Sequence, residues 1–408
     1  MTDRINPWAR VFLPFAAGYY LSYLLRNVNA VIVPELTREL GVSAADLGLL
    51  TSAYLLAFGL FQLPLGLLLD RYGPRRVEAG LLLIAAAGCA LFAAGENLPQ
   101  LVIGRALIGL GVSACLMASF KAFSLWFPAD RQASLNAAVM AAGGLGALTA
   151  TTPIGWVLPL LGWRGAFGGL ALVAIVTALG IFSTPEKPRS APHETLVEQL
   201  RGLASVFASR HFWRYAPQTT LLLGGFMAVQ GLWAVPWLMR VDGMSRDAAA
   251  FHLLLTASAM LTGYLALAFF VAPLRRRGVP PERLLLVGTG IGVLANAAIV
   301  FNLLPSHIVW FLLGLVFSVG NLAYALLQTE FPAALSGRVN TALNLCAFAG
   351  AFGIQWGFGL SIDLLLAQGV PTTPAFQLTF GTLVALQATG YAWFARGRHM
   401  GSVTPPSR

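Results

Sequence analysis

Long apolar runs dominate this sequence and decide what the chain can fold into. A bilayer core of about 30 Å is crossed by roughly 20 apolar residues in a helix. Because backbone groups in lipid must bond within their own segment, each such run predicts a transmembrane helix. The runs fall near 11–33, 47–69, 77–95, 99–124, 132–160, 163–182, 214–240, 248–272, 282–304, 306–330, 338–366 and 374–396.

Composition supports a chain solvated by lipid. Of the 408 residues, 57% are hydrophobic and 10% are charged, which is too few charges to cover a soluble protein of this length. The net charge of +10 would suggest nucleic acid for a soluble protein, but here the basic residues sit mostly in short loops, where they set orientation. We therefore expect a lipid bilayer and a small molecule as partners, no nucleic acid, and a monomer.

The sequence shows no sign of a metal, a cofactor or an enzyme. Cys89, Cys115 and Cys346 lie singly inside apolar runs, so neither a disulfide framework nor a zinc site is predicted. The glycines of Gly288–Gly292 imitate a nucleotide-binding loop, but no strand precedes them, and they predict close helix packing instead.

The distribution of Lys and Arg predicts the orientation. With both termini in the cytoplasm, most of the 26 Lys and Arg residues fall on the cytoplasmic side, whereas Arg38, Arg164, Arg240 and Arg246 fall outside. The first run is too long for a signal-peptide core and lacks a small-residue cleavage site, so we expect it to be retained. These features predict a multi-pass protein of the inner (plasma) membrane with both termini cytoplasmic.

The segment between the sixth and seventh runs divides the chain. We predict an N-terminal six-helix bundle over 1–182, a cytoplasmic linker over 183–213, and a C-terminal six-helix bundle with a short tail over 214–408. The linker is rich in proline and then offers an amphipathic helix over 194–209, which is either a tether or a regulatory element. Its predicted apolar face consists of Leu196, Leu200, Leu203 and Phe207.

A charged turn joins the second and third runs. The stretch from Gly66 to Arg76 is Gly-Leu-Leu-Leu-Asp-Arg-Tyr-Gly-Pro-Arg-Arg. It resembles the signature loop of the major facilitator superfamily, Gly-x-x-x-Asp-Arg-x-Gly-x-Arg-Arg. The resemblance implies an all-α membrane protein with twelve transmembrane helices in two pseudo-symmetric six-helix bundles, which a secondary transporter rocks about a central site. The matching residues are Gly66, Asp70, Arg71, Gly73, Arg75 and Arg76.

The same resemblance implies a conformational latch at this loop. In the family, the carboxylate that matches Asp70 meets the N-terminal end of span 11, here around Arg338–Thr341, and the arginines after it pair with neighbouring loops. The equivalent position in the second half, Val271–Gly278, keeps three arginines but lacks the glycine and the aspartate. The latch is therefore expected in the N-terminal half.

Further stretches resemble family motifs. Arg105-x-x-x-Gly109 in span 4 resembles the arginine-containing motif of the fourth helix, and Trp163-Arg164 follows a glycine in a motif at the entry to span 6. Span 5 matches the Gly-Pro-x-x-Gly-Gly motif of drug exporters only in part, because Thr152 stands where a glycine should. This departure weakens an exporter interpretation.

Arg26 is the sharpest candidate for substrate binding. A charge in the middle of a membrane helix costs at least about 2.5 kcal/mol, so it persists where it is paired, hydrated or bound to something. Tyr19, Tyr23 and Arg26 share one helical face, and such an arginine resembles the organic-anion and organophosphate branches of the superfamily. Its planar fork of donors suits a carboxylate or phosphate. The alternative is an arginine bonded within its own bundle.

Two more basic residues lie within span 4. Arg105 and Lys121 are about 24 Å apart along a helix, so they line one cavity only if the helix kinks. For Arg105 we expect a role in coupling or in packing. Lys121 can either attract an anion or extend its amine to the interface, and we favour the interface.

Polar and aromatic residues in the second half complete a predicted central site. Neutral amides and indoles opposite one arginine can hold an organic solute by hydrogen bonds and stacking. Bonds between helices are the alternative for each of them. The candidates for substrate binding are Gln230 and Trp233 on span 7 and Asn321, Tyr324 and Gln328 on span 10.

No acidic residue is predicted deep in a span. Asp70 and Glu78, among others, fall at inner ends, and Leu25 precedes Arg26 where proton-coupled relatives usually carry a carboxylate. Proton symport is therefore not predicted, whereas anion exchange, uniport or coupling through residues at the outer mouth stay open. The predicted function is transport of a small organic anion, the alternative is an efflux antiporter for drugs or metabolites, and a sensor that does not transport comes third.

Overall fold

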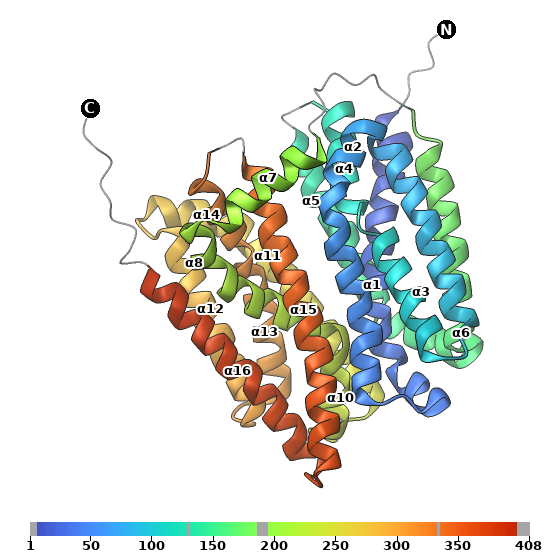
Figure 1. Ribbon diagram of the computed structural model, residues 1–408, viewed down its shortest axis with the longest axis vertical. Coiled ribbons are helices and arrows are strands. Elements are labelled where there is room, and N and C mark those ends of the chain that lie inside the picture. The colour runs from blue at the N-terminus through green and yellow to red at the C-terminus, as the bar shows by residue number, and fades with distance from the viewer. Residues whose placement is uncertain (1–5, 129–130, 186–194, 333–334, 398–408) are drawn as a thin grey trace.

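The computed structural model describes residues 6–128, 131–185, 195–332 and 335–397. Helices are the regular secondary structure throughout these ranges. They form two bundles that stand side by side, with the blue-to-green N-terminal half next to the green-to-red C-terminal half (Figure 1).

The N-terminal bundle begins with a short π-helical turn that runs directly into the first long helix. Two of its helices contain a glycine with a left-handed backbone, Gly73 (φ 79°) and Gly162 (φ 65°), and the chain turns back there. Each of those helices therefore contributes to two crossings. The elements are η1 Trp8–Phe12, α1 Leu13–Leu40, α2 Ala44–Ala94, α3 Leu98–Gly111, α4 Cys115–Trp126, α5 Gln132–Thr149 and α6 Thr152–Phe182.

The C-terminal bundle begins with one rod over Arg210–Arg240 that contains two π-helical stretches. A short helix, α7, precedes it. The elements are α7 Leu196–Phe207, α8 Arg210–Thr219, η3 Thr220–Gly224, α9 Gly225–Ala228, η4 Val229–Trp233, α10 Ala234–Arg240, α11 Arg246–Arg276, α12 Pro281–Val300, α13 Ser306–Gly320, α14 Leu322–Thr329, α15 Ser336–Ala367 and α16 Thr372–Arg396.

Counted along the described residues, these elements make the twelve predicted crossings. Eight helical stretches are long and apolar enough to cross a bilayer by themselves. Helices α1, α5 and α16 complete the bundles by packing against neighbours, α1 on α5 and α6, and α16 on α12 and α15.

Three predicted spans are interrupted. Span 4 breaks at Val112–Ala114 between α3 and α4, span 5 breaks at Ala150–Thr151, and span 10 breaks at Asn321. Non-helical backbone at membrane depth is tolerated where protein or a watery cavity covers it. The first helix also runs farther than predicted, because α1 ends only at the left-handed Gly41.

Helix α7 lies across one end of the molecule, which we call the α7 face, and the opposite end is the far face (Figure 1). A capping box starts α7, and hydrogen bonds from the backbone N–H and the hydroxyl of Thr195 lower the pKa of Glu198. The predicted apolar face is partly wrong, because Leu200 is 53% exposed while Val206 is fully buried. The proline-rich stretch 186–194 lies outside the described residues.

The two bundles are held together at the far face. Asp363 at the end of α15 accepts hydrogen bonds from the backbone N–H groups of Ala44 (3.2 Å) and Ala45 (2.7 Å) at the start of α2. Arg246 at the start of α11 pairs with Glu35 of α1. The dipole of α2 favours the carboxylate of Asp363 at its N-terminus. Both contacts join a residue of one bundle to a residue of the other.

Candidate functional site

A cavity of about 650 Å³ lies between the bundles. It extends from Arg26 in the middle of α1 to Asp70, Lys121 and Gly337 near the α7 face. Aromatic rings and a few amides and hydroxyls line it, which is the usual composition of a site for a small organic solute. The far-face contacts close the opposite end.

Arg26 lies at the closed end of this cavity, away from the α7 face. Its guanidinium lies over the rings of Tyr23 (4.9 Å), Phe58 (4.8 Å) and Phe348 (5.6 Å), so rings from both bundles surround it. Its Nε is buried without a hydrogen-bond partner, and no ion pair to it occurs among the described residues. Stacking on rings stabilises a cation but does not satisfy the buried Nε–H donor.

A second, smaller cavity of about 50 Å³ lies on the far side of Arg26. Arg26, Arg105, Gln230 and Gln355 are among its polar lining residues. Arg105 donates a hydrogen bond to the carbonyl of Leu25 (3.1 Å), yet its Nε and Nη2 have no partner. Gln355 is fully buried with both side-chain amide atoms unpaired. Unsatisfied buried donors of this kind are rare in folded proteins and require an explanation.

The structure brings the other predicted residues of the first helix to the cavity. Tyr19 and Tyr23 both line it, with their rings 5.1 Å apart edge to face. The hydroxyl of Tyr19 points to the sulfur of Met140 (3.5 Å), so this ring is held against α5.

On the opposite wall, Asn321 and Tyr324 line the cavity as predicted. Asn321 donates to the hydroxyl of Tyr264 (3.1 Å) and Tyr324 donates to the side-chain oxygen of Asn344 (3.1 Å). Asn321 sits at the break between α13 and α14, which frees its side chain toward the cavity.

Two predicted residues do not line either cavity. Trp233 is 1% exposed, donates its indole N–H to the carbonyl of Gln355 (3.0 Å) and packs beside Phe358 and Phe376. Gln328 lies on α14 away from both linings. The π-helical stretch η4 changes the rotation of the seventh span at Trp233, whereas Gln328 lies about one turn beyond Tyr324, at the end of α14.

Sequence reasoning missed several lining residues. Phe58, Phe348 and Tyr264 sit among similar apolar residues in their helices, so nothing local marks them. Gln62 is a single polar residue in an apolar run, and that signal was available. Gln62 donates to the carbonyl of Ser113 (3.1 Å) at the break in span 4.

The signature loop has a different partner from the one predicted. Asp70 pairs with Lys121 of α4, and both side chains are about one-third exposed at the cavity mouth (37% and 35%). In this conformation the carboxylate of Asp70 therefore belongs to a pair within its own bundle rather than to the N-terminal end of α15. Lys121 lies at the mouth of the larger cavity, with its amine on the carboxylate of Asp70.

The rest of the loop ties the third and sixth spans together. Gly73 supplies the left-handed turn, which explains the glycine at that place in the motif. Arg75 donates to the carbonyl of Thr184 (3.1 Å) and lies over the ring of Phe182 (4.7 Å).

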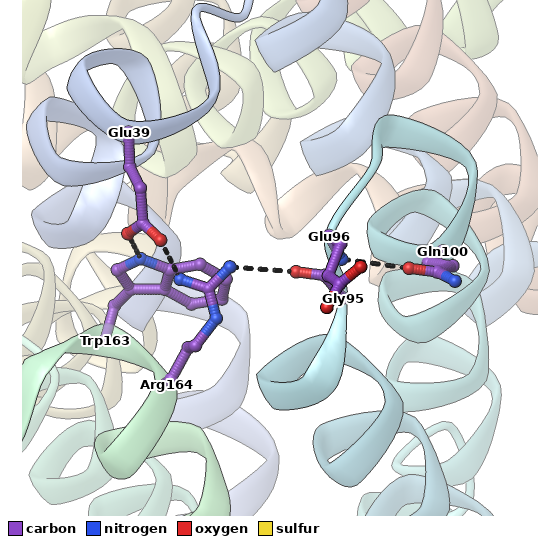
Figure 2. Close-up of polar contacts among 6 residues, drawn as sticks. All are labelled: Glu39, Gly95, Glu96, Gln100, Trp163 and Arg164. Atoms are coloured by element: carbon purple, nitrogen blue, oxygen red, sulfur yellow. Dashed lines mark hydrogen bonds and ion pairs between the residues drawn. The ribbon is translucent and has the colours of Figure 1, made fainter.

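The motif at the entry to span 6 has a similar role on the far face. Trp163 donates its indole N–H to Glu39 of α1 (2.6 Å), and Arg164 pairs with the same carboxylate and donates to the carbonyl of Gly95 (3.1 Å), as Figure 2 shows. The motif thereby joins α1, α6 and the turn after α2.

The known proteins to which this chain is similar in sequence are named as transporters. The chain is 29% identical to the probable L-galactonate transporter of Escherichia coli (strain K12) over 241 residues, which are 58% of this chain and 52% of that protein. It is 25% identical to the hexuronate transporter of the same strain over 216 residues, 49% of this chain and 50% of that protein. The chain thus spans about half the length of the curated relatives it matches.

Solved structures share the fold at low identity. A bacterial homologue of the human lysosomal transporter Spinster, inward-facing and unoccupied, superposes with a TM-score of 0.78 at 16% identity and covers 99% of this chain and 100% of that one. A D-xylose–proton symporter gives 0.71 at 18% identity, with 94% and 96% covered.

The family model of the Major Facilitator Superfamily matches residues 15–354, which include the signature loop, the whole lining of the larger cavity and the far-face contacts of α1 and α11. With two six-helix bundles, a central cavity and this match over most of its length, the chain belongs to the Major Facilitator Superfamily.

Proposed function

We propose that the protein is a secondary transporter that moves a small organic anion, a sugar acid with one carboxylate and several hydroxyls, by alternating access. The observation that carries this proposal is Arg26: a guanidinium at the closed end of the central cavity, ringed by aromatics and without a carboxylate partner among the described residues. An unpaired charge is costly to bury. A carboxylate that accepts two parallel N–H hydrogen bonds from the guanidinium would offset that cost.

The remaining lining fits the hydroxylated part of such a ligand. Asn321, Tyr264 and Asn344 present polar groups on the wall opposite Tyr19 and Tyr23. Rings beside the polar groups can stack on the apolar face of a sugar. The relatives' printed names, which include L-galactonate, hexuronate and galacturonate transporters, support the same class of ligand. Its family and relatives are transporters, so no enzymatic role is assigned.

A thermal-stability screen tests the ligand class. The purified protein is heated with D-galacturonate, D-glucuronate, D-galactonate, the neutral sugar D-galactose and lipophilic cations. We expect the three sugar acids to raise the melting temperature and D-galactose to have no effect, because only the acids can pair with Arg26. Stabilisation by lipophilic cations alone would replace the anion proposal with efflux of amphiphilic compounds.

The α7 face is assigned to the cytoplasm of a bacterial inner membrane, which makes the described conformation inward-open. We expect a cysteine at Ala204 of α7 to be protected from an impermeant thiol reagent added to intact cells, and a cysteine at Glu96 on the far face to be labelled. Both side chains are exposed. The native Cys89, Cys115 and Cys346 are first replaced by alanine. Labelling at Ala204 with protection at Glu96 would reverse the orientation.

The signature loop yields a further prediction. We infer that Asp70 exchanges Lys121 for the N-terminal end of α15 when the α7 face closes. Because the pair with Lys121 is exposed at the surface, it contributes only about 0–1 kcal/mol, so Asp70→Asn should leave the melting temperature nearly unchanged. Loss of the closed-state contact should cost about 1–2 kcal/mol and slow transport several-fold while binding persists.

Lys121→Gln is the matched control for that prediction. It breaks the same pair and keeps the carboxylate, so it should slow transport less than Asp70→Asn. Uptake of a sugar acid into proteoliposomes measures both variants. Equal slowing by the two variants, or normal uptake by Asp70→Asn at full protein level, would remove the latch role.

A further inference from the structure

Glu78 is an ionisable residue that the site described above does not use. The sequence places it at the inner end of the third span, where a carboxylate would meet water. The structure corrects this: Glu78 is 0% exposed, and neither of its carboxyl oxygens has a hydrogen-bond partner. It takes part in no ion pair among the described residues.

Three helices enclose the carboxyl. A Cβ at Gly18 of α1 would overlap Oε1 of Glu78, and Ile181 of α6 reaches the same glycine. From α4, the thiol of Cys115 faces the carboxyl and is the titratable group on that side. One turn away on its own helix, Arg75 is directed to Thr184 and Phe182. Among the residues that the structure describes, no cation therefore compensates a negative charge on Glu78.

An ionised carboxylate is not stable in such a place. Transfer of an isolated charge into a low-dielectric interior costs far more than any single packing interaction returns, and buried acids respond by holding their proton. The weakly polar thiol of Cys115 is the hydrogen-bonding group beside the neutral acid, so packing alone does not explain why this position carries glutamate rather than leucine or methionine. Within a membrane bundle, such a residue calls for a functional explanation.

The break in the fourth span lies between this acid and the central cavity. Val112 and Ser113, where the helix is interrupted, line the cavity, and Cys115 begins α4 directly after the break. The carbonyls of Val112 and Ser113 are held by side chains, the hydroxyl of Ser22 (3.4 Å) and the amide of Gln62 (3.1 Å). Opening of these two bonds would let water from the cavity reach the thiol and the carboxyl behind it.

We propose that Glu78 is a proton-binding site of this transporter and that its proton moves with the anion. The inference rests on the proposed function. The carboxylate takes a proton from water on one side of the membrane, holds it as the neutral acid in the conformation described here, and returns it through the break at Val112–Ala114 to the cavity. One anion and one proton then cross together, so no net charge is moved.

Gradient-driven uptake tests the coupling. Proteoliposomes are given an acidic exterior, and accumulation of labelled D-galacturonate is measured beside its exchange at equal pH. With one proton per anion, wild type should accumulate about tenfold for each unit of pH difference. Glu78→Gln, which has the shape of the neutral acid, should lose accumulation and keep exchange. Glu96→Gln, the same change at an exposed position, should behave as wild type.

The proton itself is detected without substrate. Infrared difference spectra between acidic and alkaline buffer should show the carbonyl band of a protonated carboxylic acid that persists at about pH 7, where exposed glutamates are ionised. That band should vanish in Glu78→Gln and stay in Glu96→Gln. A band unchanged in Glu78→Gln, or gradient-driven accumulation equal to wild type, overturns the inference. If wild type neither binds nor exchanges D-galacturonate, the ligand proposal fails, and the infrared band still decides whether Glu78 holds a proton.

Discussion

Replacing Arg26 with alanine should abolish sugar-acid binding while the protein still folds. The guanidinium has no carboxylate partner among the described residues and its Nε is buried unpaired, so its removal leaves no orphaned counter-charge behind. Hydrogen bonds to charged groups contribute about 1.5–3 kcal/mol each, so losing a two-pronged contact should weaken binding by at least a hundredfold. Titration of D-galacturonate against the purified variant, followed by calorimetry, measures the loss.

Two further variants define what Arg26 does. Arg26→Lys keeps the charge but loses the planar fork and its stacking on Phe58 and Phe348, so it should also bind weakly. Arg240→Ala removes an exposed arginine outside both cavities and should bind normally. If Arg26→Ala binds D-galacturonate as wild type does but melts at a lower temperature, the arginine is structural and the anion assignment falls.

Loss of the far-face contacts should open that face. Asp363 accepts two backbone hydrogen bonds from the start of α2, and Arg246 pairs with Glu35 while also donating to the carbonyl of Val31 (2.8 Å). Each contact joins the two bundles, so breaking it destabilises only the conformation in which the far face is closed. In Asp363→Asn with Arg246→Gln, we expect a shift of about 2–3 kcal/mol, or one to two orders of magnitude in population.

Thiol labelling measures this shift. Thr51 lines the small cavity on the far side of Arg26, and in the described conformation it is buried. With the native cysteines replaced, a cysteine at Thr51 should react with an impermeant reagent much faster in the double variant. Asp242→Asn is the matched control, because Asp242 bonds to Ser306 within the C-terminal bundle. Equal reaction rates in the double variant and the control would show that these contacts do not hold the face closed.

The architecture followed from the sequence because it depends on solvation by lipid. Length and apolarity decide which segments cross, and lysine and arginine in the loops predict the orientation, which the labelling test addresses. Local chemistry was equally readable at the left-handed Gly73 in the signature loop and at Arg26, whose charge in an apolar run demanded a cavity. Each of these inferences requires only the identity of a residue and of its neighbours along the same segment of the chain.

What the sequence left undecided are contacts between helices far apart in the chain. The rings over Arg26 from α2 and α15, the pair of Asp70 with Lys121, and the closure of the far face by Asp363 all depend on how the helices are rotated and tilted. Breaks and π-helical stretches shift that rotation, which removed Trp233 from the cavity. Packing of α1, α4 and α6 buried Glu78, which the sequence had placed at the inner end of the third span. A helical pattern fixes which residues share a face, whereas only packing determines what that face meets.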